Sequence, residues 1–166
     1  MDFTIFVTSK CNLKCKYCYE GNEKSNINMT VDTANKTIEF IANRVKNLDV
    51  ERPVNIVFHG GEPLLNFELI KHMLKCITEK IDREIIFSMT TNGTIMTDEI
   101  TEYITDHINN ISISIDGTRN AHDLNRTFYD GSGSYGIVIH NAKKLLLRDI
   151  DVRARMTFNS QNVDEL

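Results

Sequence analysis

Short, β-branched apolar runs alternate along the chain with longer stretches of helical period, and this alternation constrains the fold more than any other feature. Each run has the length and composition of a buried strand, and each longer stretch has the apolar stripe of a helix that packs on a sheet. Repeated βα units of this kind form a parallel sheet. The predicted fold is therefore α/β, with (βα)4 followed by a fifth strand. The five predicted strands are residues 3–8, 54–59, 85–90, 110–115 and 152–158.

Helix start signals occur between these strands. Thr30 and Thr97 are predicted N-caps, because each precedes an apolar periodic stretch with an acidic residue in its first turn. Two further helices are predicted to begin at Asn66 and Ser134. Two segments, residues 19–28 and 117–133, lack such a pattern and are predicted to be loops.

The composition of the chain indicates a single globular domain and argues against nucleic acid and membranes as partners. The chain has 166 residues, of which 41% are hydrophobic and 25% charged, so it is long enough for one domain with a sizeable core. Its net charge of −4 gives no cationic excess for a phosphate backbone, and nucleic acid is excluded as a principal partner. No apolar run approaches the roughly 18 residues of a membrane span, and no charged leader is present. We therefore expect no membrane association and a cytoplasmic location.

Three of the four cysteines are crowded together directly after the first predicted strand. They are Cys11, Cys15 and Cys18. Such spacing is poor for disulfides and suits a metal site. Three thiolates can hold a [4Fe-4S] cluster and leave its fourth iron open to another ligand, as a catalytic zinc site keeps one position open. The carboxyl end of a strand is also where α/β folds place their chemistry.

The cysteine spacing alone leaves other sites open. A structural zinc ion completed by His59 or His72 is one alternative, and a redox dithiol formed by Cys15 and Cys18 is another. The fourth cysteine, Cys76, lies within a helical apolar pattern and is predicted to be a buried free thiol.

The next three predicted strands all end in polar residues followed by glycine. The sequences are HGGEP at residues 59–63, TTNG at 90–93 and SISIDG at 112–117. Glycines allow a backbone to approach a ligand closely, and a carboxylate at a strand end can pair with an ammonium group. Each sequence alone is an ordinary turn signal. Parallel strands bring them to the same rim as the cysteines, which favours a shared site.

These motifs together resemble those of the radical S-adenosyl-L-methionine (SAM) superfamily. The spacing of Cys11, Cys15 and Cys18, with Tyr17 before the last cysteine, resembles its signature, and the sequence GGE at residues 60–62 resembles its second motif. The stretches HGGEPLL, TTNG, ISIDG and HDLNR are similar to the SPASM-type subgroup, which contains anaerobic sulfatase-maturating enzymes and maturases of ribosomally made peptides. The resemblance covers nearly the whole chain.

The resemblance also implies a ligand set. Cys11, Cys15 and Cys18 would hold a [4Fe-4S] cluster whose open iron is chelated by the amino and carboxylate groups of SAM. Tyr17 would lie near the adenine, and Arg126 would pair with the SAM carboxylate. The SAM amino group would contact Gly60, Gly61 and Glu62, and further contacts to the nucleoside or methionine would come from Asn92, Ser114 and Asp116.

Arg126 has a second interpretation that needs no ligand. In the sequence HDLNR it can also fix its loop through an ion pair with Asp123 or Asp130.

The implied reaction is reductive cleavage of SAM to a 5′-deoxyadenosyl radical, which abstracts hydrogen from a substrate. The subgroup implies a peptide or protein substrate and an electron donor such as flavodoxin or ferredoxin. The alternatives are a non-enzymatic zinc or redox module, and a fragment that folds without a cluster.

Two departures from the family pattern follow from counting elements. The family core is a partial (β/α)6 TIM-like barrel, and the subgroup carries a C-terminal extension with further cysteines for auxiliary clusters. No sixth strand and no such cysteines follow the fifth strand here. Residues 1–166 are therefore predicted to be a radical SAM core domain truncated at the C-terminus, which can self-associate through an uncovered fifth strand.

Overall fold

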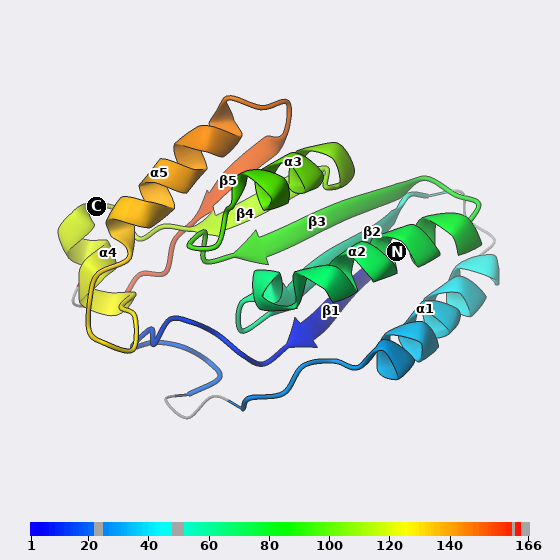
Figure 1. The fold of residues 1–166 in the computed structure, drawn as a ribbon, viewed down its shortest axis with the longest axis horizontal. Helices are drawn as coiled ribbons and strands as arrows, with labels where there is room; N and C mark the ends of the chain where they lie inside the picture. The colour runs from blue at the N-terminus through cyan, green and yellow to red at the C-terminus, as the bar shows by residue number, and fades with distance from the viewer. Residues whose placement is uncertain (22–24, 48–51, 161, 164–166) are drawn as a thin grey trace.

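One parallel sheet forms the centre of the computed structural model, which describes residues 1–21, 25–47, 52–160 and 162–163. Its strands pair in the order β1-β2-β3-β4-β5, so each new strand is added beside the previous one (Figure 1). This arrangement confirms the predicted α/β fold with five parallel strands. The strands are β1 (Asp2–Thr8), β2 (Val54–Gly60), β3 (Ile85–Thr91), β4 (Asn110–Ser114) and β5 (Asp151–Arg155).

Helices connect consecutive strands. They are α1 (Val31–Lys46), a 3-10 turn η1 (Pro63–Asn66), α2 (Phe67–Lys80), α3 (Asp98–His107), α4 (Arg119–Asn125) and α5 (Tyr135–Leu146). The predicted caps at Thr30 and Thr97 are confirmed. The Thr30 hydroxyl accepts a hydrogen bond from Thr33 N, and the Thr97 hydroxyl accepts one from Ile100 N, both at 3.2 Å. Asn66 and Ser134 occupy the N-cap positions of α2 and α5 without a side-chain cap bond.

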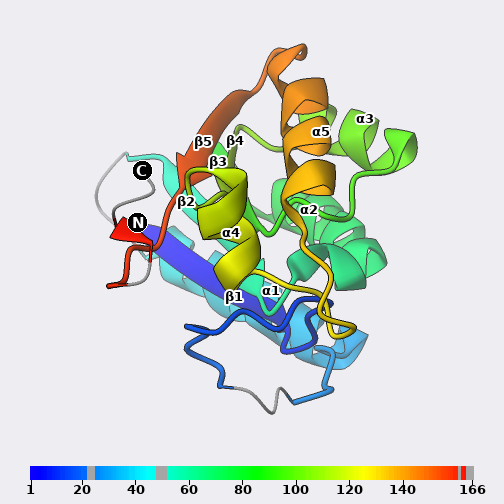
Figure 2. The same ribbon diagram turned by 90° about the vertical axis from the view of Figure 1, so that its left-hand side faces the viewer.

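Helices α1, α2, α3 and α5 cover one face of the sheet (Figures 1 and 2). Alternate strand residues point into this layer, as in β2, where Val54, Ile56 and Phe58 are buried and their neighbours are not. The apolar stripes of the helices meet them in one continuous core. Each fully buried Ile or Phe contributes about 1.5–3 kcal/mol through the hydrophobic effect.

The other face of the sheet carries no helix layer. Its residues include the exposed Phe6 of β1 and, on the following strands, His59, Thr90, Ser114 and Arg155. This polar, concave face is the inside of a partial barrel, and its carboxyl end holds the candidate site described below.

The prediction of a loop at residues 117–133 is wrong, because this segment contains α4. Thr118 caps this helix by accepting a hydrogen bond from Ala121 N at 3.3 Å, and Ala121, His122 and Asn125 are buried. With seven residues, α4 is too short to show an apolar stripe of helical period in the sequence. It closes the carboxyl end of the sheet (Figure 2).

The fifth strand is shorter than predicted and ends at Arg155 instead of residue 158. The backbone N–H of Thr157 donates to the Asp116 carboxylate at 3.2 Å and no longer joins the sheet. The predicted loop at 19–28 is only partly described, since residues 22–24 lie outside the described ranges. Its second half is tied to the end of β1 through a bond from the Thr8 hydroxyl to Ile27 O at 3.1 Å.

No helix within the described ranges is both long enough and apolar enough to cross a bilayer.

Candidate functional site

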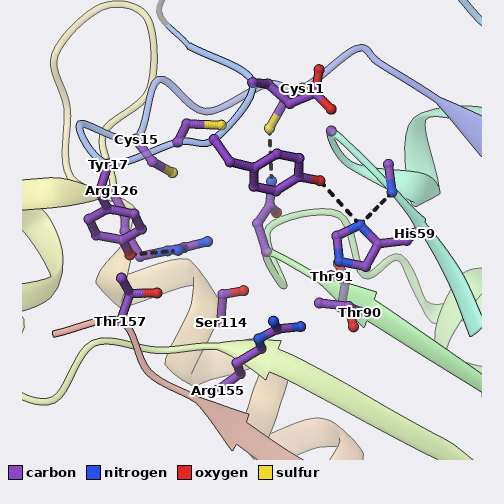
Figure 3. A pocket seen from close by; sticks show the side chains of 16 residues that line it. Cys11, Cys15, Tyr17, His59, Thr90, Thr91, Ser114, Arg126, Arg155 and Thr157 are labelled. Atoms are coloured by element: carbon purple, nitrogen blue, oxygen red, sulfur yellow. Dashed lines mark hydrogen bonds between the residues drawn. The ribbon is translucent and has the colours of Figure 1, made fainter. Parts of the chain in front are cut away.

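A cavity of about 300 Å³ opens at the carboxyl ends of the strands (Figure 3). It has the size of a small-ligand site. Nine of the residues expected from the sequence line it together: Cys11, Cys15, Tyr17, Cys18, Gly60, Gly61, Asn92, Ser114 and Arg126. Two others, Glu62 and Asp116, do not line it.

Backbone hydrogen bonds hold the cysteine loop, residues 9–20, on both sides. On the side of β2, Gly61 N donates to Thr8 O at 2.9 Å and Glu62 N donates to Lys10 O at 2.7 Å. On the side of α4, Lys14 N donates to Thr127 O at 2.8 Å and Lys16 N donates to Asn125 O at 2.9 Å. The loop is therefore positioned by the fold as well as by anything that it binds.

The paired glycines are required by close packing. A Cβ atom on Gly60 would lie 2.3 Å from Thr8 O, and one on Gly61 would lie 2.3 Å from Lys10 O. Gly60 also has a φ of 154°, a conformation that other residues rarely adopt. Both positions let the end of β2 approach the start of the cysteine loop.

Glu62 does not present its carboxylate to the cavity, and its expected contact with the SAM amino group stays a prediction. Its side chain is fully buried and accepts hydrogen bonds from Leu64 N at 3.1 Å, the Thr91 hydroxyl at 2.8 Å and Asn92 N at 2.7 Å. Burial raises the pKa of Glu62, and these bonds oppose that shift. Glu62 therefore joins β2 to the end of β3 beneath the site.

Asp116 also lies behind the cavity wall, and its expected contact with the nucleoside or methionine stays a prediction. Its carboxylate accepts a hydrogen bond from the Tyr17 hydroxyl, and that hydroxyl in turn accepts one from Arg126 Nη1 at 2.8 Å. Burial raises the pKa of Tyr17 well above its usual range, so the hydroxyl keeps its proton. Asp116 thus orients Tyr17, and Tyr17 orients Arg126.

Arg126 lines the cavity with one hydrogen-bonding atom unused. Its side chain is 7% exposed, and Nε is buried without a partner. Within the described part of the chain, neither Asp123 nor Asp130 forms an ion pair with it. The loop-fixing interpretation is therefore not supported, and the buried donor is left for a ligand.

Asn92 lines the cavity and fixes the cysteine loop. Its amide donates to Asn12 Oδ1 at 2.8 Å and lies 3.8 Å from Cys11 Sγ. Ser114 lines the cavity from the end of β4 (Figure 3).

The structural zinc site considered above lacks a grouped set of ligands among the described residues. His72 lies on α2, bonds to Asn35 at 2.8 Å and does not line the cavity. If two cysteines bound one tetrahedral zinc ion, their sulfur atoms would lie ~3.8 Å apart, because Zn–S bonds are about 2.3 Å long. Among the residues that the structure describes, no three His, Cys, Asp or Glu side chains are grouped to hold a single metal ion. Cys76, predicted to be buried, is partly buried beside His72.

His122 links the site to α5. Its Nδ1 accepts from Asp116 N at 3.3 Å, its Nε2 lies 2.9 Å from Ser134 Oγ, and that hydroxyl donates to Arg126 O at 2.6 Å. Burial, and secondarily Arg126, lowers the pKa of His122 to about 4. The neutral imidazole is therefore part of the folded network.

A pH dependence of stability follows from His122. Because its pKa is lower in the folded chain than in the unfolded chain, its contribution is complete above pH ~6.5 and is lost as the pH falls towards 4. The loss should be on the order of 2–3 kcal/mol. Urea unfolding at several pH values should show a flatter profile for His122→Gln than for wild type, with His140→Gln at an exposed position of α5 as the control for the substitution itself. Identical profiles for wild type and His122→Gln would contradict the assignment.

Sequence reasoning missed Arg155 and Thr157 as cavity residues, and it considered His59 only as a zinc ligand. The sequence of the fifth predicted strand did indicate Arg155 and Thr157, because Arg153, Arg155 and Thr157 alternate there with apolar residues. Such alternation places every second residue on the inner face of the barrel.

Comparisons with known proteins agree with this geometry. The family model described as Radical SAM superfamily matches residues 5–166. The radical SAM cyclopropyl synthase TigE of Paramaledivibacter caminithermalis is 30% identical over 143 residues, which cover 78% of this chain and 29% of TigE. The cysteine-type anaerobic sulfatase-maturating enzyme of Clostridium novyi is 28% identical over 169 residues, which cover 96% of this chain and 44% of that enzyme.

A solved structure shares the fold. The structure of native anSMEcpe with bound AdoMet and Kp18Cys peptide superposes with a TM-score of 0.80 at 22% identity, over 92% of this chain and 42% of that one. The chain spans less than half the length of these curated relatives.

Proposed function

The chain belongs to the radical SAM superfamily, and we propose from this membership that its cavity binds a [4Fe-4S] cluster and SAM and starts radical chemistry on a peptide or protein. The family uses this cluster together with SAM. One observation carries the proposal: all three cysteines of the loop line a single cavity with Gly60, Gly61 and Arg126.

The residues of the cavity fit these cofactors. Three cysteine thiols are the donor set that an iron–sulfur cluster takes, and three of them leave one iron for another ligand. Arg126 offers a buried Nε–H without a partner, which suits the single carboxylate of SAM. Gly60 and Gly61 line the cavity without side chains, so that a methionine amino group can approach their backbone.

The cluster, when bound, supplies the electron that cleaves the sulfonium of SAM to a 5′-deoxyadenosyl radical. The residues of the chain position the reactants. Tyr17 and Asp116 hold the Arg126 guanidinium at the cavity wall, and Glu62 and Asn92 hold the cysteine loop against β2 and β3.

A peptide or protein is the proposed substrate class. Support comes from relatives whose names include a sulfatase-maturating enzyme and from a structural neighbour described with a bound peptide. The chain covers only part of these proteins, so the group that is modified is not assigned.

Several features of the proposal remain predictions. They include residues 1–166 as one radical SAM core domain, a cytoplasmic location and an electron donor such as flavodoxin or ferredoxin. Self-association through β5 is a further prediction, since β5 is an edge of the sheet and the nearby Leu147 and Phe158 are 86% and 59% exposed.

Anaerobic reconstitution with iron and sulfide tests the proposal. The reduced, reconstituted chain should convert SAM to 5′-deoxyadenosine and methionine, which chromatography detects, and the protein without iron should not. A chain that binds close to four irons but leaves SAM intact in the presence of dithionite would contradict the proposed activity.

A further inference from the structure

The inner face of the barrel carries a second guanidinium besides Arg126, which was assigned above to the SAM carboxylate. Arg155 is the last residue of β5, lines the cavity and points into it (Figure 3). Its neighbour on the same face, Arg153, forms an ion pair with Asp151 at 2.7 Å. Within the described ranges, no carboxylate forms an ion pair with Arg155. The cavity therefore holds two arginines, and SAM offers only one carboxylate.

His59 provides a second hydrogen-bond donor in the same part of the cavity. Its Nδ1 accepts the backbone N–H of Gly60 at 2.9 Å, so the neutral ring carries its proton on Nε2. Burial lowers the pKa of His59 and Arg155 lowers it further, whereas the hydrogen bond with Gly60 and the Glu20 carboxylate oppose the shift. The His59 ring and the Arg155 guanidinium both point into the cavity (Figure 3). The imidazole also packs against Phe6 in a tilted arrangement, with 5.0 Å between the ring centroids.

Charged lining residues favour an anionic ligand, because Arg126 and Arg155 face a single carboxylate, that of Glu20. Glu20 is near enough to His59 to raise its pKa, but among the described residues it forms no ion pair with Arg155. Arg126 lies on the other side of the cavity, next to Tyr17 and Cys15. A guanidinium and an imidazole N–H that face the same space can bind both oxygens of one carboxylate.

We propose that His59 and Arg155 form a subsite for a carboxylate of the substrate, so that the peptide carries an acidic side chain beside the residue that reacts. This inference rests on the proposed function, because it assigns the substrate class of the same cavity. The two residues come from β2 and β5, on the inner face of the barrel, and the hydroxyl of Tyr19 in the cysteine loop lies 3.5 Å from His59 Nδ1.

The test compares peptide selection by the reconstituted full chain with SAM bound. The probes are two pools of random octapeptides that differ only at one fixed position, which is Glu in one pool and Gln in the other. Wild-type protein should bind at least three times as much peptide from the Glu pool as from the Gln pool, as quantified by mass spectrometry. Arg155→Gln should lower this ratio to about one. Arg155→Glu should instead favour a third pool, in which the fixed position is Lys.

Arg153→Gln is the matched control, since it removes an arginine from the same strand that lies outside the cavity, and it should keep the preference. SAM affinity is measured in parallel and should change less than twofold in Arg155→Gln. Equal retention of both pools by wild type, or a large loss of SAM affinity in Arg155→Gln, would overturn the subsite. Failure of the wild-type chain to bind cluster and SAM would instead overturn the proposed function and the subsite with it.

Discussion

Gly61→Ala should prevent the cysteine loop from taking its place and abolish cluster uptake. The added methyl group would lie 2.3 Å from Lys10 O and 2.7 Å from Ser9 O, both backbone atoms that precede Cys11. It would also break the bond from Glu62 N to Lys10 O. We expect a loss of stability of about 3 kcal/mol or more, the upper range for an inserted methyl group in a packed site. Urea unfolding measures the stability, and iron content after reconstitution measures the cluster.

Gly136→Ala is the matched control for this substitution. It makes the same chemical change near the start of α5, where the nearest atoms to the new Cβ are the end of the Arg119 side chain at 3.7 Å. This variant should be neutral or more stable by up to about 0.5–1 kcal/mol. A Gly61→Ala protein as stable as the control, with full iron content, would show that the contact between β2 and the cysteine loop is dispensable.

Glu62→Ala should destabilise the whole carboxyl rim, with SAM binding and cluster uptake reduced together. Removing the carboxylate leaves Leu64 N, Asn92 N and the Thr91 hydroxyl buried without an acceptor. Each unpaired group costs about 1–3 kcal/mol, so a total of about 3 kcal/mol or more is expected. Glu62→Gln should cost less, because one oxygen remains as an acceptor.

The control is Glu79→Gln at an exposed position of α2, which should change stability by less than about 0.5 kcal/mol. Urea unfolding and SAM titration of the reconstituted variants separate the two possible roles of Glu62. A Glu62→Ala protein with normal stability and iron but weakened SAM binding would restore the direct ligand role that the sequence suggested.

The fold was predictable because periodicity and caps are local properties. The alternation of the strands and the caps at Thr30 and Thr97 are visible in short windows of sequence, and the structure confirms both. Helix α4 was missed because its seven residues carry too little pattern. The end of β5 was missed because it depends on a bond between Thr157 and Asp116, which are 41 residues apart.

The candidate site was predictable in its location and less so in the roles of its residues. Parallel strands bring their carboxyl ends to one rim, so motifs that follow β1, β2, β3 and β4 had to meet there. Whether a carboxylate faces the cavity or the core depends on the turn after each strand. Glu62 and Asp116 both turn inward and support the wall, and no local pattern distinguishes that orientation from exposure.

Cleavage of SAM by the reconstituted chain, compared across four single cysteine variants, tests whether the cysteine loop holds the catalytic cluster. We expect Cys11→Ala, Cys15→Ala and Cys18→Ala to lose the cluster and form no 5′-deoxyadenosine, because each removes one cavity thiol that would bind the cluster. Cys76→Ala should keep both, since Cys76 lies on α2 outside the cavity. Retention of cluster and SAM cleavage by any of the three loop variants, or their loss in Cys76→Ala, would contradict this expectation.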